Sequence, residues 1–187
     1  MVTDTFMEQV VKKTPTKRDK TLEVMVKFCA FMLAMALIFT CMAYYVKAAP
    51  LAVFLGIMAI YLSFRLTKKL DVEYEYIFTN GELDVDKIIA KSKRKRLCTV
   101  KFNSISAFGL WDDDMAVDED STIVLASDNA EGAKEYFVDF KYKDYGDTTL
   151  FFSPNSELME LIIPYLPREI RKDFSSTYKP DTDDSEE

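Results

Sequence analysis

The sequence predicts a membrane α-helical hairpin joined to a domain of about seven antiparallel β-strands that one C-terminal helix closes. Two apolar runs without a charged residue, Phe28–Val46 and Ala48–Phe64, are separated only by Lys47. After Leu70 the hydrophobic pattern changes from helical spacing to the alternation that is typical of strands. A final apolar stripe at residues 158–165 returns to helical spacing and predicts the closing helix.

The two apolar runs are long enough to cross a membrane. At ~1.5 Å rise per residue they form helices of about 28 and 26 Å, close to the thickness of a hydrocarbon core. A soluble domain of this size could not bury two neighbouring helices that are apolar on all sides. The alternative is a cleaved signal peptide, since Val46-Lys47-Ala48 resembles a cleavage site. However, the first run is longer than a typical signal sequence and a second run follows at once.

Small residues recur four apart within the runs. Ala30 and Ala34 lie in the first run, and Ala52 and Gly56 lie in the second. This spacing lets two helices approach closely in lipid, although ordinary apolar composition explains it equally well.

Positive charges predict that both termini are cytoplasmic. Basic residues flank the hairpin on both sides, whereas the turn between the runs holds Lys47 alone. Because basic flanks stay on the cytoplasmic side, we expect a multi-pass protein of the cell membrane with this turn outside. The flanking residues are Lys12, Lys13, Lys17, Arg18, Lys20 and Lys27 before the first run, and Arg65, Lys68 and Lys69 after the second.

Charge and composition divide the chain into four segments. Residues 1–70 are net basic although the whole chain carries −7, so the remainder is strongly acidic and is not expected to bind nucleic acid. The predicted segments are a cytoplasmic N-terminal segment (1–20), a transmembrane hairpin (21–69), a cytoplasmic β domain (70–173) and a disordered acidic tail (174–187).

Residues 3–13 leave two interpretations open. Thr3 or Asp4 would cap a short amphipathic helix that lies on the membrane surface, and Pro15 would stop it. A disordered tail is equally compatible with so short a segment.

The β domain begins with a hairpin. Val72–Phe78 alternates apolar and polar residues, and Asn80-Gly81 supplies the positive φ angles of a type I′ turn before the return strand Glu82–Ile89. The basic run Lys91–Arg96 is expected to form a loop or hairpin tip. Further strands are expected at 97–102, 104–111, 122–126, 135–142 and 148–152, with an acidic loop at 112–120.

One amphipathic helix is expected after the strands. Its stripe consists of Leu158, Leu161, Ile162 and Tyr165, and Pro164 and Pro167 kink or end it. A helix across the open end of a curled sheet covers apolar side chains that would otherwise remain exposed.

This order of elements resembles the pleckstrin-homology-like (PH-like) fold. The stretches YEYIFTNGELDVDKI, KRKRL and SPNSELMELIIPYLPREI are similar to those of uncharacterised two-helix membrane proteins of Gram-positive anaerobes, over about residues 5–173. The resemblance implies a bacterial PH-like domain at a membrane. It implies no activity and transfers no catalytic residue.

The residue types present do not predict an enzyme. The sequence has no histidine, which removes the commonest general base and the commonest metal ligand. Cys29, Cys41 and Cys98 lack metal-binding spacing and suit a reducing compartment. The carboxylates of residues 112–120 lack the spacing of a calcium loop, so a solvated loop is favoured. We therefore predict no catalytic residue, no metal site and no cofactor.

The candidate binding site is the basic cluster, defined as Lys91, Lys93, Arg94, Lys95 and Arg96. Anionic cytoplasmic lipid attracts such residues by ~1 kcal/mol per cation near the surface. The alternatives are a solvated hairpin tip and an internal pairing with the acidic loop.

The predicted function is a non-enzymatic, membrane-anchored module that docks a protein partner or the anionic cytoplasmic membrane surface. The alternative is an accessory subunit of a membrane transport or envelope-enzyme complex. The expected partners are the lipid bilayer, anionic lipid headgroups and an unidentified membrane or cytoplasmic protein.

Overall fold

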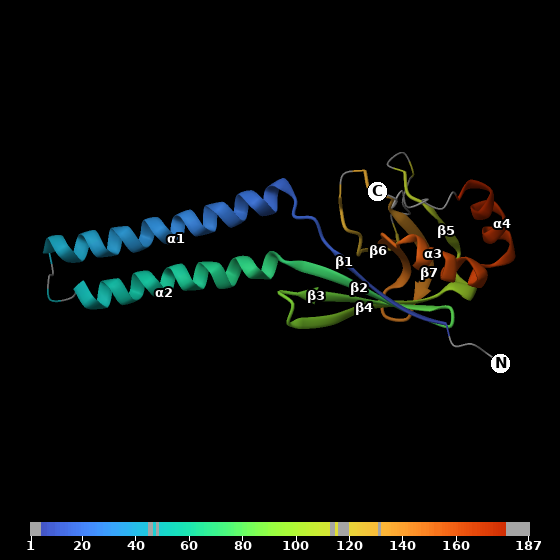
Figure 1. Ribbon diagram of the computed structural model, residues 1–187, viewed down its shortest axis with the longest axis horizontal. Coiled ribbons are helices and arrows are strands. Elements are labelled where there is room, and N and C mark those ends of the chain that lie inside the picture. The colour runs from blue at the N-terminus through green and yellow to red at the C-terminus, as the bar shows by residue number, and fades with distance from the viewer. Residues whose placement is uncertain are drawn as a thin grey trace, which may run out of the picture. The chain divides into compact units, whose positions relative to one another are not determined.

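A computed structural model describes residues 5–44, 47, 49–112, 115, 120–130 and 132–178 (Figure 1). The chain divides into two compact units. A helical unit contains Thr14–Val72 together with Ile89–Ser92. A β unit contains the N-terminal residues up to Lys13, Glu73–Ile88 and the chain from Lys93 onward.

Two long helices form the helical unit and run side by side (Figure 1). Helix α1 spans Lys17–Tyr44, and helix α2 spans Ala49–Thr67 and continues into the short 3-10 helix η2 at Lys68–Leu70. At their contact, a Cβ added to Gly56 would lie 3.2 Å from the Cβ of Ala34. The small residues therefore lie where the two helices pack most closely.

Helix α1 begins well before its apolar run. The side chain of Asp19 accepts hydrogen bonds from the backbone N–H and the hydroxyl of Thr16, at 3.1 and 2.9 Å. One turn further, Glu23 pairs with Lys27. These local bonds satisfy polar groups at the helix start and explain why the helix extends into the polar segment.

Most apolar side chains of the two helices are exposed. Phe39 in α1 is 77% exposed and Leu51 in α2 is 62% exposed. Both helices are long and apolar enough to cross a membrane, judged by length and composition.

The β unit contains eight described strands in two four-stranded sheets. The first sheet has the order β1-β2-β3-β4, with β1 at Phe6–Lys12, β2 at Val72–Thr79, β3 at Glu82–Ile89 and β4 at Lys93–Lys101. The second has the order β5-β7-β8-β6, with β5 at Ala107–Leu110, β6 at Thr122–Leu125, β7 at Tyr136–Tyr142 and β8 at Gly146–Phe152. Strands β6 and β8 pair in parallel, so the expectation of about seven strands, all antiparallel, was wrong on both points.

Strand β1 accounts for the additional strand and corrects both interpretations of residues 3–13. It pairs antiparallel with β2, with register partners that run from Phe6 opposite Thr79 to Lys12 opposite Glu73. The helical interpretation failed because it did not account for Gln9, which lies between Met7 and Val11 on the inward face of the strand. The hydrogen-bonding partners of Gln9 lie far along the chain. The predicted β domain, which starts at residue 70, therefore omits strand β1.

The glutamine in question, Gln9, joins β1 to the segment after β8. Its side-chain N–H donates to the carbonyl of Ser153 at 3.1 Å, and its side-chain oxygen accepts from the backbone N–H of Asn155 at 3.0 Å. These bonds explain why a polar residue is retained on the inward face of an edge strand.

The Asn-Gly turn between β2 and β3 is confirmed. Asn80 and Gly81 have φ angles of +48° and +89°, as a type I′ turn requires. A Cβ at Gly81 would lie 2.5 Å from the ring of Tyr165, so glycine is needed there for space as well as for conformation.

Aromatic side chains from both sheets form the core of the β unit. The rings of Tyr76 in β2 and Phe152 in β8 meet edge to face at 5.9 Å. The Tyr76 hydroxyl donates to the carbonyl of Ala126 and accepts from the N–H of Ser153, and burial raises its pKa. The buried hydroxyl thus satisfies two backbone groups at once.

Two helices, rather than one, follow the strands. Helix α3 spans Ser156–Ile162, the 3-10 helix η4 spans Ile163–Tyr165, and helix α4 spans Arg168–Thr177. The side chain of Asn155 caps α3 by accepting from the N–H of Leu158 at 2.9 Å. Pro164 and Pro167 lie between α3 and α4. A proline has no backbone N–H to continue the hydrogen bonds of a helix, so the two helices are separate.

Helix α4 also corrects the start of the predicted tail. Phe174 is 7% exposed, and its ring lies 4.8 Å from the ring of Phe108. Residues 174–177 are therefore part of the folded unit. The rest of the predicted tail, apart from Tyr178, lies outside the described residues.

Candidate functional sites

Most of the basic cluster lies in a strand. Lys93–Arg96 form the first part of β4, whereas the turn before it contains Ala90 and Lys91, with φ angles of +52° and +53°. The expectation of a loop or tip was therefore wrong for Lys93–Arg96. It failed because charged residues are common on the exposed end of an edge strand, where they limit pairing with other chains.

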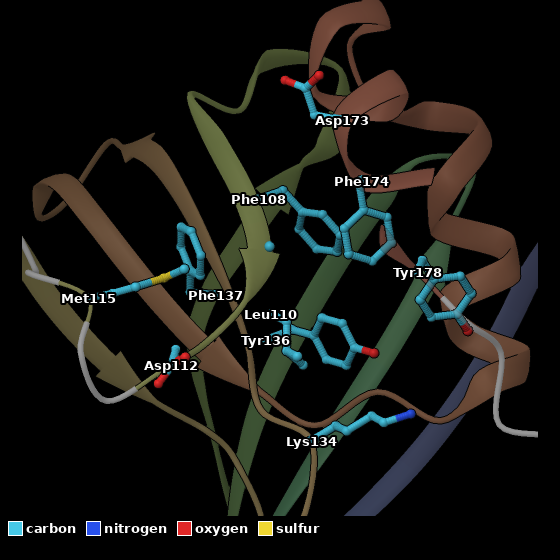
Figure 2. Close-up of a pocket in the computed structure, with 11 residues that line it drawn as sticks. Phe108, Leu110, Asp112, Met115, Lys134, Tyr136, Phe137, Asp173, Phe174 and Tyr178 are labelled. Atoms are coloured by element: carbon cyan, nitrogen blue, oxygen red, sulfur yellow. The ribbon is translucent and has the colours of Figure 1, made fainter. Parts of the chain in front are cut away.

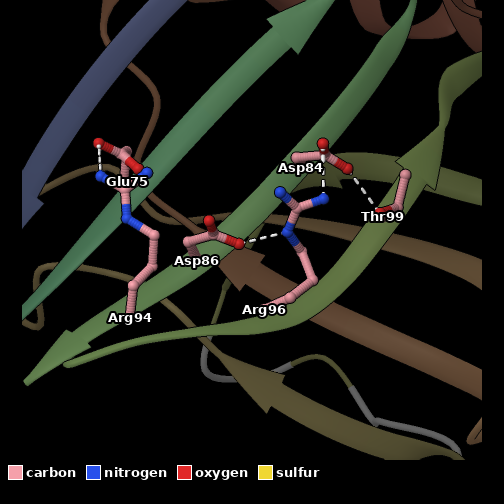
Figure 3. Close-up of polar contacts among 6 residues, drawn as sticks. All are labelled: Glu75, Asp84, Asp86, Arg94, Arg96 and Thr99. Atoms are coloured by element: carbon pink, nitrogen blue, oxygen red, sulfur yellow. Dashed lines mark hydrogen bonds and ion pairs between the residues drawn. The ribbon is translucent and has the colours of Figure 1, made fainter.

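The two arginines of the cluster bind acidic residues of β2 and β3 in the same sheet (Figure 3). Arg94 Nη2 lies 2.9 Å from Glu75 Oε1 on β2. Arg96 Nη1 lies 2.6 Å from Asp84 Oδ2, and its Nε donates to Asp86 on the same strand, β3. The hydrogen bond that Arg96 donates to Asp86, whose side chain is 5% exposed, raises the pKa of the Arg96 guanidinium.

These contacts separate the arginines of the cluster from its lysines. The arginines have internal partners on β2 and β3. Residues 113, 114 and 116–119 of the acidic loop lie outside the described residues, so a pairing of the cluster with this loop stays a prediction. Lys93 and Lys95 are exposed and form no ion pair with any residue that the structure describes. Lys93 and Lys95 are therefore the better candidates for an external anionic ligand.

The turn between β3 and β4 belongs to the helical unit. The N–H of Ala90 donates to the carbonyl of Asp71 at 2.8 Å, and Ile89–Ser92 cluster with the hairpin. Asp71 directly follows η2, which contains Lys68 and Lys69. The structure thus brings this turn, whose one basic residue is Lys91 and which we call the basic turn, to the end of the second apolar helix. No local pattern in the sequence indicated this proximity.

A second candidate site is a pocket of about 590 Å³ beside β5 (Figure 2). Most of its wall is apolar or aromatic, and charged residues lie at its margin. The wall includes Phe108, Leu110, Tyr136, Phe137, Phe174 and Tyr178, and the charged residues are Asp112, Lys134 and Asp173. Of these residues, only Asp112 was considered from the sequence, as part of the acidic loop, and no pocket was predicted here.

Ring contacts shape the pocket. Phe174 packs on Phe108 and stacks on Tyr178 at 5.2 Å, which places α4 and the residue after it against β5. On the neighbouring strand, the ring of Phe137 lies 3.1 Å from the position of a Cβ on Gly109, so only glycine fits there without a shift. An aromatic wall with few polar groups suits non-covalent binding of an apolar group.

Neither site has the groups of a metal centre. Among the described residues, no cluster of cysteine, aspartate and glutamate could hold a metal ion. Burial raises the pKa of the Cys98 thiol to about 12, so this cysteine remains protonated and inert at neutral pH.

Two sheets, a set of closing C-terminal helices and a helical hairpin between the first two strands define a PH-like domain with two apolar helices. The chain belongs to the bacterial PH-like domain family (DUF6106), whose model matches residues 3–172. The match includes β1 and both apolar helices, and it confirms the resemblance stated from the sequence. No curated protein and no solved structure matches the chain.

Proposed function

We propose that the protein is a non-enzymatic, membrane-anchored docking module whose β3–β4 turn contacts the anionic cytoplasmic membrane surface. The observation that carries this proposal is the hydrogen bond from Ala90 to Asp71, which holds the basic turn at the end of α2. A helix end that leaves the membrane lies at the headgroup level, so residues held there meet the lipid surface.

The exposed apolar helices support the anchoring role. In water, the outward side chains of α1 and α2 would leave a large apolar surface unburied, whereas a bilayer covers it. Soluble proteins bury such helices in a core, and here only the face between the two helices is buried.

Pairing of β1 with β2 supports a topology with both termini on one side. The hairpin is inserted between two adjacent, paired strands, so the chain must return to the side from which it left. An inserted segment that crosses the membrane therefore crosses it an even number of times. Together with the basic flanks, this arrangement favours two crossings with both termini in the cytoplasm.

The lipid contact is assigned to Lys93 and Lys95 of the cluster. Lys93 is the first residue of β4 after the turn and Lys95 lies two residues further along the strand. Each cation near an anionic surface contributes ~1 kcal/mol. Arg94 and Arg96 are expected to contribute less, because their charges are already paired. The acidic β unit opposes this attraction, so the contact depends on the anchor that keeps the turn close to the surface.

Lysine acetylation of the full chain in nanodiscs tests the lipid contact. Adding phosphatidylglycerol to neutral phosphatidylcholine nanodiscs should slow acetylation of Lys93 and Lys95 by about fivefold, which corresponds to ~1 kcal/mol each. The exposed Lys143, in the turn between β7 and β8, is the matched control. Protection should disappear near 1 M salt, where screening acts within about 3 Å. Equal acetylation in both lipids would exclude the contact.

Docking of a protein partner is the second candidate function. It is favoured by the apolar pocket beside β5, which is not needed for anchoring. An accessory role in a transport or envelope-enzyme complex is favoured by the outward apolar faces of α1 and α2, which other membrane helices could cover. Co-purification of a defined complex in mild detergent distinguishes this role from that of an independent module.

A further inference from the structure

We infer that lipid chains cover the outer face of α1 as far as Thr21, and that Glu23 and Lys27 form an ion pair inside this boundary, held against the second helix. Thr21 lies about two turns before the uncharged run begins at Phe28. The inference rests on the membrane anchoring proposed above. It adds to that anchor a charge pair within the membrane.

The charged side chains of this part of α1 face α2. Lys27 follows Glu23 by one helical turn and Ala34 lies two turns further, so all three lie on one face of α1. Ala34 is the residue of α1 at its close contact with Gly56. Lys27 pairs with Glu23, and its Nζ lies 5.2 Å from the centre of the Phe64 ring on α2. Both charges are therefore held at the side where the two helices meet.

The outer face of the same segment carries no charge. Leu22, Val24 and Met25 are 53%, 66% and 58% exposed, whereas the charged Glu23 between them is half-buried. Thr21 donates its hydroxyl to a carbonyl one turn earlier, that of Lys17, at 2.8 Å, so this polar group is already satisfied. Exposed apolar side chains with satisfied polar groups suit lipid rather than water.

The thickness of a bilayer favours the longer covered segment. From Phe28 to the end of α1 at Tyr44 the helix is only ~26 Å long, whereas from Thr21 it is ~36 Å long. Lys47, which follows the end of α1, marks the far surface. A hydrocarbon core of ~30 Å takes about 20 helical residues, which reach from Tyr44 back to Met25. The core therefore passes the level of Lys27.

Helix α2 is compatible with the same depth. Counted from the close contact of the two helices, Lys68 in η2 is about level with Leu22 of α1. Leu66, just before this level, is 48% exposed. Arg65 is exposed and lies deeper, but its long side chain carries the guanidinium toward the headgroups. The polar segments of both helices thus begin at a similar level.

An ion pair inside the boundary behaves differently from one in water. A charge in the hydrocarbon layer is costly unless a partner accompanies it, and Lys27 has both Glu23 and the face of an aromatic ring. Removing one partner of such a pair leaves an uncompensated charge, whereas replacing both by neutral side chains avoids that cost. Loss of one partner from an exposed pair of the same spacing is nearly neutral.

The test measures how fast a charged, water-soluble maleimide labels single cysteines of the full chain in phosphatidylcholine nanodiscs. The background carries Cys29→Ala, Cys41→Ala and Cys98→Ala, which remove the natural thiols. The introduced cysteines are Arg18→Cys in the polar segment, Met25→Cys on the outer face and Phe28→Cys in the uncharged run. Each rate is divided by the rate of the same variant in dodecyl sulfate.

Lipid cover predicts slow labelling at the outer face. Met25→Cys should react at least about tenfold more slowly than Arg18→Cys and about as slowly as Phe28→Cys, because lipid chains exclude the charged reagent.

The charge pair is tested in the Met25→Cys background. Glu23→Gln should speed labelling about fivefold, since the unpaired Lys27 moves toward water and draws the segment with it. Adding Lys27→Met to Glu23→Gln should restore slow labelling. Lys20→Met, which removes an exposed cation of the same helix, is the matched control and should leave the rate unchanged.

Two results would overturn the inference alone. Labelling of Met25→Cys as fast as that of Arg18→Cys, with Phe28→Cys still slow, would place the boundary at the uncharged run. An unchanged rate after Glu23→Gln would make the pair an ordinary surface contact. Fast labelling of Phe28→Cys as well would overturn the membrane anchoring together with the inference.

Discussion

The contribution of β1 to the β unit can be measured by keeping or removing residues 5–12. Because Lys12 and Glu73 are register partners, a two-residue Asn-Gly turn between them should close a β1–β2 hairpin in place of α1 and α2. The resulting soluble module contains residues 5–12, the turn and residues 73–178. It is compared with a fragment of residues 73–178 that lacks β1.

The structure gives the expected size of the effect. Val11 is 8% exposed, and burial of such a side chain stabilises a fold by about 2 kcal/mol. The hydrogen bonds of Gln9 with Ser153 and Asn155 contribute about 1 kcal/mol each. The fragment should therefore lose about 4 kcal/mol, which approaches the whole stability of a weakly stable domain at about 5 kcal/mol.

Urea unfolding followed by circular dichroism measures the free energy of unfolding of both proteins. The module should unfold in one cooperative transition, and the fragment should be partly unfolded without urea. Within the module, Gln9→Ala should cost about 2 kcal/mol. Glu8→Ala, at an exposed position of the same strand, should change the free energy by less than about 0.5 kcal/mol. Equal free energies for module and fragment would refute the assignment of β1 to the β unit.

Three further predictions concern packing and burial. Gly56→Leu should force α1 and α2 apart at Ala34 and destabilise the full chain by about 1–3 kcal/mol, seen as a lower melting temperature in detergent; an unchanged melt would contradict the close contact. Tyr76→Phe should cost the module about 1–3 kcal/mol in urea unfolding, because two backbone groups lose their partner, and a neutral effect would argue against those bonds. The folded pKa of Cys98, about 12, exceeds the unfolded value of about 8.5, so its stabilising contribution is complete below pH 8.5 and is lost as the pH rises toward 12. Cys98→Ala should therefore reduce the fall in the free energy of unfolding that begins near pH 8.5. An unchanged dependence of this free energy on pH would show that the Cys98 thiol is not buried.

Local patterns were sufficient for much of the fold. The two apolar helices, the Asn80-Gly81 turn and the strands from β2 to β8 were all recognisable from their own residues. Each of these features depends on the spacing of side chains within one segment, or on the backbone preference of one or two residues. The basic cluster was also recognised as unusual, because charge density is a property of the sequence alone.

The candidate sites were only partly predictable. Lys93 and Lys95 keep the exposed position that the sequence indicated, whereas Arg94 and Arg96 proved to be paired with β2 and β3. The pocket beside β5 was missed entirely, because Phe108 and Phe174 are far apart in the chain and the latter was assigned to a disordered tail. The polar, acidic composition of residues 174–187 concealed Phe174, whose ring packs on Phe108 of β5.

The sequence by itself determined that the chain has two apolar helices and a β-rich domain, and where most of the strands begin and end. Only the tertiary structure decided that β1 joins the domain across the hairpin, that β6 pairs in parallel with β8, and that Ala90 binds Asp71. The physical reason is that an alternating pattern specifies which face of a strand is buried but not which strand lies beside it. Likewise, a run of charges specifies a preference for water or for opposite charge, and the folded chain alone supplies the partner.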